Sequence, residues 1–320
     1  MKTGSLNDSR KKLERYCQTL KGMRRVHVSL IKRGHNRSVY LLVVAGKKYV
    51  GRVGKKNNDG GSSINNEVRM LKFFENAGIT FTPKVLHYNK KLRISIETFV
   101  GTHLIHFKTF TPKDIDCFAR QLTAIHKLPT KAFRGFCKKE GFPLPKTLSP
   151  KANLELFGVR RFAKAIKTCP DKKVLDWISV RLKKNIREVS RSNKQPPAHL
   201  IWGDIGDNTQ SGKGRVFFID WEFATLRNST ELAYIKIHSH PSTSTFRTLV
   251  FAYAQYSKIP EKILWKEIED EEKIVRVNDV IWAAMKWGEY ASTREEEHYR
   301  LLTYKRMKLF EQIKNQTERN

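Results

Sequence analysis

Two aspartates and one asparagine form the set of residues in this chain that is best suited to chemistry. Asp204 and Asp220 each end an apolar run, and Asn208 lies four positions after Asp204. The segment Thr209–Gly214 between them has the composition of a turn, so we expect a hairpin that brings the three side chains around one point. Such a set suits phosphoryl transfer: Asp204 would orient or deprotonate a hydroxyl, while Asn208 and Asp220 would hold Mg²⁺ through oxygen. Alternatively, either aspartate alone could merely cap a strand.

The segment around Asp220 carries a motif. Ile219-Asp220-Trp221-Glu222 resembles the I-D-W-E motif of the aminoglycoside phosphotransferase and choline kinase superfamily, and it differs from the D-F-G of protein kinases. The resemblance implies an α+β, bilobal protein-kinase-like fold, with a small antiparallel-sheet N-lobe over residues 1–100 and a mostly helical C-lobe over 101–320. It also implies ATP and Mg²⁺ as cofactors and an alcohol group as phosphate acceptor.

The catalytic loop departs from the family pattern H-G-D-x-x-x-x-N in two places. Trp202 stands where the family has histidine, and Asn208 follows Asp204 by four positions instead of five. The histidine is largely structural in the family, so its replacement does not by itself imply an inactive enzyme. The shorter loop means that Asp207 or Thr209 could take part of the role of Asn208. A catalytically inactive, kinase-fold binding module is therefore one alternative.

The resemblance extends upstream and suggests five residues that bind the nucleotide. Ser38 ends a turn that is similar to the family's phosphate-covering turn, although an ordinary hairpin explains it equally well. Arg52, on an expected strand, stands where a basic residue pairs with the α- and β-phosphates. Glu67, at the start of an amphipathic helix, stands where the partner of that basic residue belongs, or it only favours the helix dipole. Glu97 and Phe99 lie in a strand that resembles the hinge at the adenine.

The charge of the chain points to anionic partners. Lys and Arg number 62 against 31 acidic residues, a formal net charge of +31. Arg181, Lys184 and Arg187 recur at helical spacing and share one face. The helices of this region form the wall of the acceptor pocket in the kinases that the chain resembles, so the resemblance implies a wall that binds an anionic acceptor, either a small metabolite or RNA. A solvated helix face and a purely compositional excess are the alternatives. A kinase acting on RNA or protein is the rival function, and Asp220-Trp221-Glu222 disfavours it.

Length and composition suggest where the protein works. The chain has 320 residues, 39% of them hydrophobic, which is enough for a full core and two lobes. No apolar run reaches the about 18 residues that a membrane span needs, and the four cysteines match no zinc or disulfide spacing. We therefore expect a cytoplasmic enzyme without a membrane partner, whose residues 1–25 form a helix or a basic arm. Beyond Asp220 the pattern predicts helices over 242–256, 259–268, 277–290 and 295–314.

Overall fold

The computed structural model describes residues 6–33, 37–55, 64–101, 103–104, 106–191, 198–203, 205, 208–212, 215–239 and 241–317. The chain divides into two compact units. The sheet unit comprises Met1–Pro145, Leu200–Thr225 and Pro241–Tyr253, and the helical unit comprises Lys146–His199, Leu226–His240 and Ala254–Asn320. The sheet unit thus holds both the N-terminal strands and the segment that carries Asp220.

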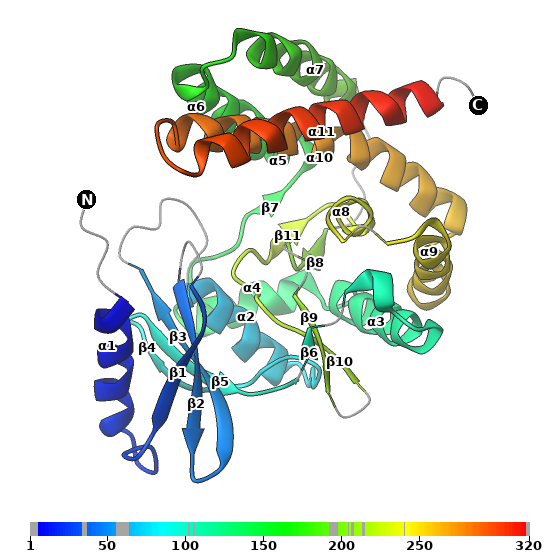
Figure 1. Ribbon diagram of the computed structural model, residues 1–320. Coiled ribbons are helices and arrows are strands. Elements are labelled where there is room, and N and C mark those ends of the chain that lie inside the picture. Colours follow the sequence, from blue (N-terminus) through cyan, green and yellow to red (C-terminus); the bar gives the residue numbers. More distant parts are fainter. Residues whose placement is uncertain are drawn as a thin grey trace. The chain divides into compact units, whose positions relative to one another are not determined.

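A five-stranded antiparallel sheet forms the frame of the sheet unit (Figure 1). Its strand order is β1-β2-β3-β5-β4, and every neighbouring pair is antiparallel, as the sequence predicts. The strands are β1 (His27–Arg33), β2 (Arg37–Val44), β3 (Lys47–Gly54), β4 (Val85–Asn89) and β5 (Ile94–Thr98). Helices α1 (Leu6–Gln18) and α2 (Ile64–Asn76) lie on opposite sides of this sheet in Figure 1.

The two faces of the sheet differ because side chains alternate along each strand. One face is apolar and packs against α1; it includes Tyr40, Leu42, Val53, Ile94 and Ile96, together with Leu13 and Cys17 of the helix. A Cβ atom at Gly51 would lie 2.8 Å from Leu13 Cδ2, so the absence of a side chain there lets α1 approach. The positions between these apolar residues include Arg52, Ser95 and Glu97, which therefore belong to the opposite face. A shift of one residue in register would exchange the faces.

A hairpin carries the chain towards Asp220. Strand β9 (Thr209–Gly212) pairs antiparallel with β10 (Arg215–Phe218). The hairpin is confirmed, but the expected turn over Thr209–Gly214 is too long, because the first four of these residues already form β9. The neighbouring elements are β6 (His103–Leu104), a 3₁₀ turn at Phe107–Thr109, α3 (Pro112–His126), α4 (Thr130–Lys139) and β8 (His199–Ile201). The Gln121 side-chain amide of α3 donates to the Val216 carbonyl at 3.0 Å and ties the helix to β10.

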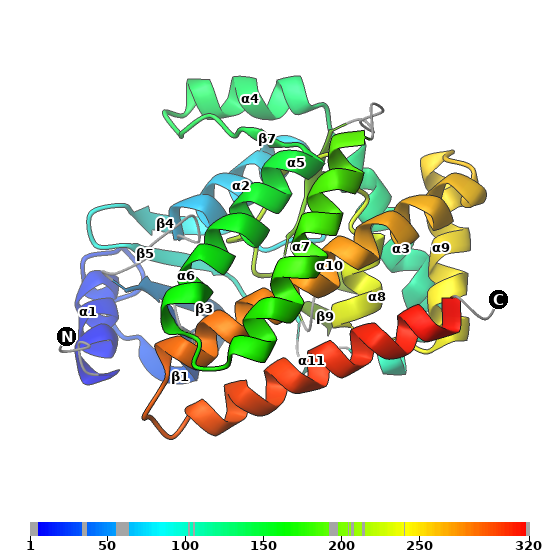
Figure 2. The same ribbon diagram turned by 90° about the horizontal axis from the view of Figure 1, so that it is seen from above.

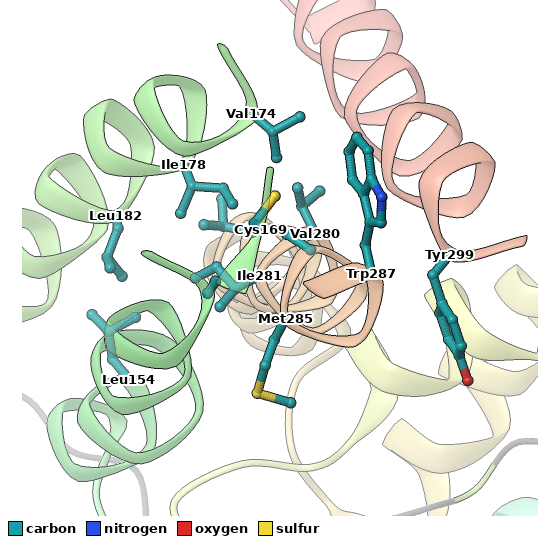
Figure 3. Packing of buried hydrophobic residues seen from close by; sticks show 13 residues of the cluster. Leu154, Cys169, Val174, Ile178, Leu182, Val280, Ile281, Met285, Trp287 and Tyr299 are labelled. Carbon is teal, nitrogen blue, oxygen red and sulfur yellow. The ribbon is translucent and has the colours of Figure 1, made fainter. Parts of the chain in front are cut away.

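The helical unit is organised around one long helix, α10 (Glu261–Glu289), which contacts α6, α7, α8 and α11 (Figure 2). Its core consists of aliphatic and aromatic side chains from these helices (Figure 3). A Cβ atom at Gly288 would lie 2.4 Å from Thr168, so glycine permits the close approach to the end of α6. Besides α10, this unit contains β7 (Thr147–Leu148), α5 (Pro150–Asn153), a π-helical turn η2 (Leu154–Val159), α6 (Arg160–Thr168), α7 (Lys172–Arg191), α8 (Leu232–His238) and α11 (Glu296–Thr317). Two further elements, β11 (Thr225–Arg227) and α9 (Thr243–Ser257), begin in the sheet unit and end in the helical unit.

The expectation of separate helices over 259–268 and 277–290 was wrong, because α10 is continuous. The acidic segment between them contains no glycine or proline, and two of its four acids, Glu271 and Glu272, have cationic partners. Lys236 donates to Glu272 at 2.6 Å, and Arg276, one turn later on α10, does so at the same distance. Neutralised in this way, the segment extends the helix instead of ending it.

Two further observations concern the whole described chain. None of its helices combines the length and the apolarity needed to cross a bilayer. All four cysteines are free thiols, and three of them are buried.

Candidate active site

Arg52 is fixed on the polar face of the sheet by two carboxylates. Its Nε–H donates to Glu97 at 2.9 Å, and its Nη2 lies 3.3 Å from Glu67 of α2. The pairing with Glu97 follows from register: Arg52 lies opposite Ser95 on β5, so Glu97 is its diagonal neighbour on the same face. The Ser95 hydroxyl in turn donates to the second oxygen of Glu97 at 2.7 Å. This buried basic side chain therefore has a single, well-defined orientation.

Arg37, at the start of β2, joins three acidic side chains. Its Nη1 donates to Glu67 and its Nη2 to Asp220, while Glu222 lies 3.4 Å from Nη1. The Arg37 side chain is 5% exposed and that of Glu67 is fully buried, whereas Asp220 keeps 21% of its side-chain surface exposed. The network thus closes towards α2 and opens at Asp220.

The network contains fewer positive than negative side chains. Two arginines, Arg37 and Arg52, face the four carboxylates of Glu67, Glu97, Asp220 and Glu222, so the fully ionised group has a net charge of −2. Burial raises the pKa of the Glu67 carboxyl, and the attraction of the two arginines does not offset this. At Asp220 burial acts in the same direction, but Arg37 and then Arg52 outweigh it and lower the pKa of that carboxyl. Asp220 therefore stays ionised and can accept a cation.

The backbone conformation at Asp220 is unusual and is held by neighbouring residues. Its φ is +66°, a left-handed conformation that costs a non-glycine residue about 1 kcal/mol or more. The buried indole of Trp202 donates to the carbonyl oxygens of Ile219 and Asp220, both at 3.0 Å. Trp202 also stacks on Phe218 and Trp221, with ring centroids 4.7 and 5.0 Å apart. Trp202 thus holds the two carbonyl groups that flank the Asp220 Cα atom.

Gly203 and Asn66 also contact the loop that follows Asp220. Gly203 has a φ of +83°, and a Cβ atom there would lie 2.5 Å from the Phe223 carbonyl oxygen. The Asn66 side chain of α2 donates to the Glu222 carbonyl at 2.6 Å and to the Ala224 carbonyl at 3.1 Å. The loop after Asp220 is therefore anchored from both Trp202–Gly203 and α2.

Asn208 lies next to the Asp220 strand in the structure. Its carbonyl oxygen accepts from the Ile219 amide at 3.0 Å, and its own amide donates to Ile205 at 3.2 Å. Asp204, the expected catalytic residue, and Asp207 lie outside the residues that the structure describes. In the part of the chain that the structure describes, no group of three or more His, Cys, Asp or Glu side chains could hold a metal. The network nevertheless suits Mg²⁺, which commonly takes one or two carboxylates. It contains more carboxylates than arginines, and one of these carboxylates is partly exposed.

Comparison with solved structures identifies the fold. No family model matches the sequence, and no curated protein does. A choline kinase from Cryptosporidium parvum matches with a TM-score of 0.68 at 12% identity, over 96% of this chain and 97% of its own. A choline/ethanolamine kinase family protein from Mesorhizobium loti matches with a TM-score of 0.67 at 14% identity, over 95% and 93%. An aminoglycoside phosphotransferase in complex with AMP-PNP and hygromycin B matches with 0.61 at 13%, over 92% and 98%. The chain has the kinase-like fold of these choline kinase and aminoglycoside phosphotransferase structures.

Within this kinase-like fold, the other expected nucleotide-site residues lie on the sheet. Ser38 is buried beside Arg37 and pairs with Val53 of β3. Phe99 follows β5 and is half-buried, with the Lys48 ammonium 5.8 Å from its ring centroid. The Glu97 side chain is bonded to Arg52, and the residue is paired in the sheet with Val50 of β3 and Val85 of β4.

The three expected acceptor-binding residues lie on α7 in the helical unit and differ in their surroundings. The Arg181 guanidinium lies 4.0 Å from the Trp177 ring centroid and donates to Glu311 of α11. It therefore joins two helices of this unit. Lys184 is 69% exposed and lies 3.8 Å from Glu188, and Arg187 is exposed. Lys184 and Arg187 are the two cations of this set that face solvent.

Sequence reasoning missed Arg37 and Glu222. Both belong to segments that the motif comparison had already singled out, the turn before Ser38 and the I-D-W-E motif. The available signal for Arg37 was a cation at the first position of an otherwise apolar strand. Such a residue requires a buried acid as partner, but the sequence alone does not show which acids surround it.

Proposed function

We propose that the protein is an ATP-dependent phosphotransferase that transfers the γ-phosphate to a hydroxyl group of a small, anionic acceptor. The observation that carries this proposal is the buried network that joins Arg52 of the sheet, Glu67 of α2 and Asp220. Phosphoryl transfer needs little covalent chemistry from the protein, and its catalysis rests on positioning and on charge neutralisation. A rigid basic residue beside an accessible carboxylate meets both requirements.

The proposed roles follow from the chemistry of each group. Arg52, held by Glu67 and Glu97, would bind the α- and β-phosphates. Asp220 and Asn208 would hold Mg²⁺, which neutralises phosphate charge when it is bound. Asp204 would orient the acceptor hydroxyl and accept its proton.

Two further parts of the nucleotide would be bound by the sheet. The turn before Ser38 would approach the phosphates, and Ser38 would fix the strand after it, because Ser38 pairs with Val53 on the sheet face opposite Arg52. The end of β5, with Phe99 just beyond it, would meet the base, and Glu97 would contribute by holding Arg52 in place. Free cysteines and an ATP-dependent reaction agree with a cytoplasmic protein.

The anionic acceptor is proposed from charge. A net charge of +31 attracts anions and repels polycations, and Lys184 and Arg187 offer exposed cations on α7, with Arg181 beside them. The same charge favours RNA as a second candidate acceptor. Salt separates the two, because the logarithm of polyanion affinity falls with log[salt] at roughly 0.7–0.9 per neutralised phosphate, so that a long contact gives a steep slope.

Nucleotide binding and turnover test the proposal. Thermal stability is measured with ATP and with GTP, each with and without Mg²⁺, and ATP turnover is then followed over a panel of anionic, neutral and cationic alcohols. We expect Mg²⁺-dependent stabilisation and turnover with an anionic alcohol. Asp204→Asn should keep nucleotide binding and lower turnover by roughly 10²–10⁴-fold. Stabilisation without turnover on any acceptor would favour the inactive binding module, and absence of both would refute the proposal.

A further inference from the structure

Arg37 contacts the same carboxylate that the proposed function assigns to a metal. Its two terminal nitrogens have different partners: Nη1 donates to Glu67 and Nη2 donates to Asp220. Because Glu222 lies 3.4 Å from Nη1, the guanidinium is in contact with three acids. We propose that Arg37 takes the place of a divalent cation at Asp220 in the metal-free protein, and that Mg²⁺ and Arg37 compete for this carboxylate. The inference rests on the proposed function, because that function gives Asp220 its metal.

The competition follows from the geometry of the carboxylate. Asp220 Oδ1 accepts a charge-assisted hydrogen bond from Arg37, and a lone pair used in this way is not available to coordinate an ion. Asp220 is the partly exposed member of the network, whereas Glu67 is fully buried. An ion arriving from solvent therefore reaches Asp220 first and meets the Arg37 bond there.

The exchange requires only one end of the arginine to move. Since Glu67 is bound through Nη1 and Asp220 through Nη2, Arg37 can release Asp220 while it keeps Glu67. The released Nη2 then becomes a charged donor at the edge of the site, where a phosphate oxygen of the nucleotide can accept from it. Arg37 would thus resist Mg²⁺ alone and favour Mg²⁺ that arrives together with phosphate. It acts as a positioning residue for Asp220 and as a second phosphate-binding cation beside Arg52.

Manganese binding without nucleotide is the direct test. Mn²⁺ is titrated by calorimetry into the full-length protein and into Arg37→Gln. Arg37→Gln loses a charge-assisted hydrogen bond to Asp220, so Mn²⁺ should bind to this variant at least about tenfold more tightly than to the wild type. Adding Asp220→Asn to Arg37→Gln should abolish the gain, which assigns the ion to Asp220. A folded Arg37→Gln protein that binds Mn²⁺ no more tightly than the wild type, or a gain that survives Asp220→Asn, would overturn the inference.

Two matched variants distinguish the position of Arg37 at Asp220 from its contribution to the overall charge. Arg52→Gln removes an equally buried cation of the same network that has no ion pair with Asp220, and Arg227→Gln removes a buried arginine that pairs instead with Glu271 of α10. We expect a smaller gain in Arg52→Gln than in Arg37→Gln and none in Arg227→Gln. Equal gains in Arg52→Gln and Arg37→Gln would show that charge alone controls the ion and would overturn the proposed place of Arg37.

A second variant covers the case in which Arg37→Gln does not fold. Arg37→Lys keeps the charge but carries its three N–H donors on a single nitrogen, so it lacks the two separated nitrogens through which the guanidinium reaches Glu67 and Asp220. We expect several-fold tighter Mn²⁺ binding in this variant, and unchanged binding there would contradict the inference. Because these titrations contain no nucleotide, a failure of the inference can be told apart from a failure of the proposed function: a protein that never binds ATP can still show the gain, and one that binds ATP can lack it.

Discussion

Replacing Trp202 by phenylalanine tests how the Asp220 loop is held. Phenylalanine keeps an aromatic ring in the stack with Phe218 and Trp221 but removes the indole N–H. That N–H donates to the carbonyl oxygens of Ile219 and Asp220, both at 3.0 Å. The substitution therefore leaves two carbonyl groups of the buried loop without this donor.

The expected loss has two parts. A net hydrogen bond contributes about 0.5–1.5 kcal/mol, and two carbonyls left without a donor place the loss at the upper end of that range or above it. The smaller ring adds about 1 kcal/mol for the space left in a fully buried site. We therefore expect Trp202→Phe to lower the free energy of unfolding by about 2–3 kcal/mol. Because Asp220 adopts a φ of +66°, loss of its anchor should also weaken metal binding, by about tenfold for each 1.4 kcal/mol.

Urea denaturation followed by far-UV circular dichroism measures the effect without relying on tryptophan fluorescence. Trp265→Phe is the matched control, because the Trp265 indole donates at 2.9 Å to Glu261, one turn earlier on the surface of α10. This control should lose less than about 0.5 kcal/mol. Trp202→His should recover part of the metal affinity, since an imidazole N–H can reach one carbonyl. If Trp202→Phe loses no more stability than Trp265→Phe, the indole does not anchor the loop.

The remaining predictions concern charge. Asp220→Asn should abolish Mg²⁺-dependent nucleotide stabilisation while the protein stays folded, and unchanged metal dependence in a thermal-shift assay would remove Asp220 from the metal role. Burial raises the pKa of the Glu271 carboxyl from 4.5 to about 7, although the attraction of Arg227 opposes this. Between these two pH values the folded protein keeps a proton that the unfolded chain loses. The free energy of unfolding therefore falls as the pH rises from 4.5 to about 7. Glu271→Gln should therefore be more stable than the wild type at pH 8, by up to about 3 kcal/mol, and equal to it near pH 4.5 in denaturant titrations; a constant difference would contradict this. Reversing Lys184 and Arg187, the two residues of the set that face solvent, to glutamate should raise the acceptor KM steeply with little change in ATP affinity, and efficient turnover that ignores the reversal would leave the charge as composition alone.

Much of the fold could be predicted because it follows from local patterns. Alternation of apolar and polar residues indicated the strands around Arg52 and Glu97, and the spacing of apolar residues after Glu67 indicated a helix. The error in α10 has the opposite origin. A run of acidic residues resembles a solvated break, but partners distant in sequence neutralise it, among them Lys236 on α8. Periodicity cannot show a salt bridge that joins two helices.

The candidate site was less predictable than the fold. Motif comparison selected Arg52, Glu67 and Asp220, and ion pairs with Arg37 and among these residues join all three. It did not select Arg37, because its significance depends on residues 30 and 183 positions away in sequence. The selection of Arg181 depended on charge and spacing, and neither shows that the guanidinium packs on Trp177 and pairs with Glu311. A charged residue on a helix face can bind a ligand or a second helix, and only the packing decides which.

The residues that break local rules in this protein lie close together. Arg37 is a cation at the start of an apolar strand, and Asp220 is a non-glycine residue with a positive φ. Trp202 occupies the place of a histidine, and Gly203 accommodates a backbone that would exclude any Cβ atom. Each exception would destabilise the protein if it stood alone, yet here each supports another: Arg37 neutralises Asp220, and Trp202 holds the backbone that lets Asp220 face Arg37. Local strain that is retained in this way is expected where function requires a fixed geometry, which is why the loop from Trp202 to Glu222 is the part of the chain to test first.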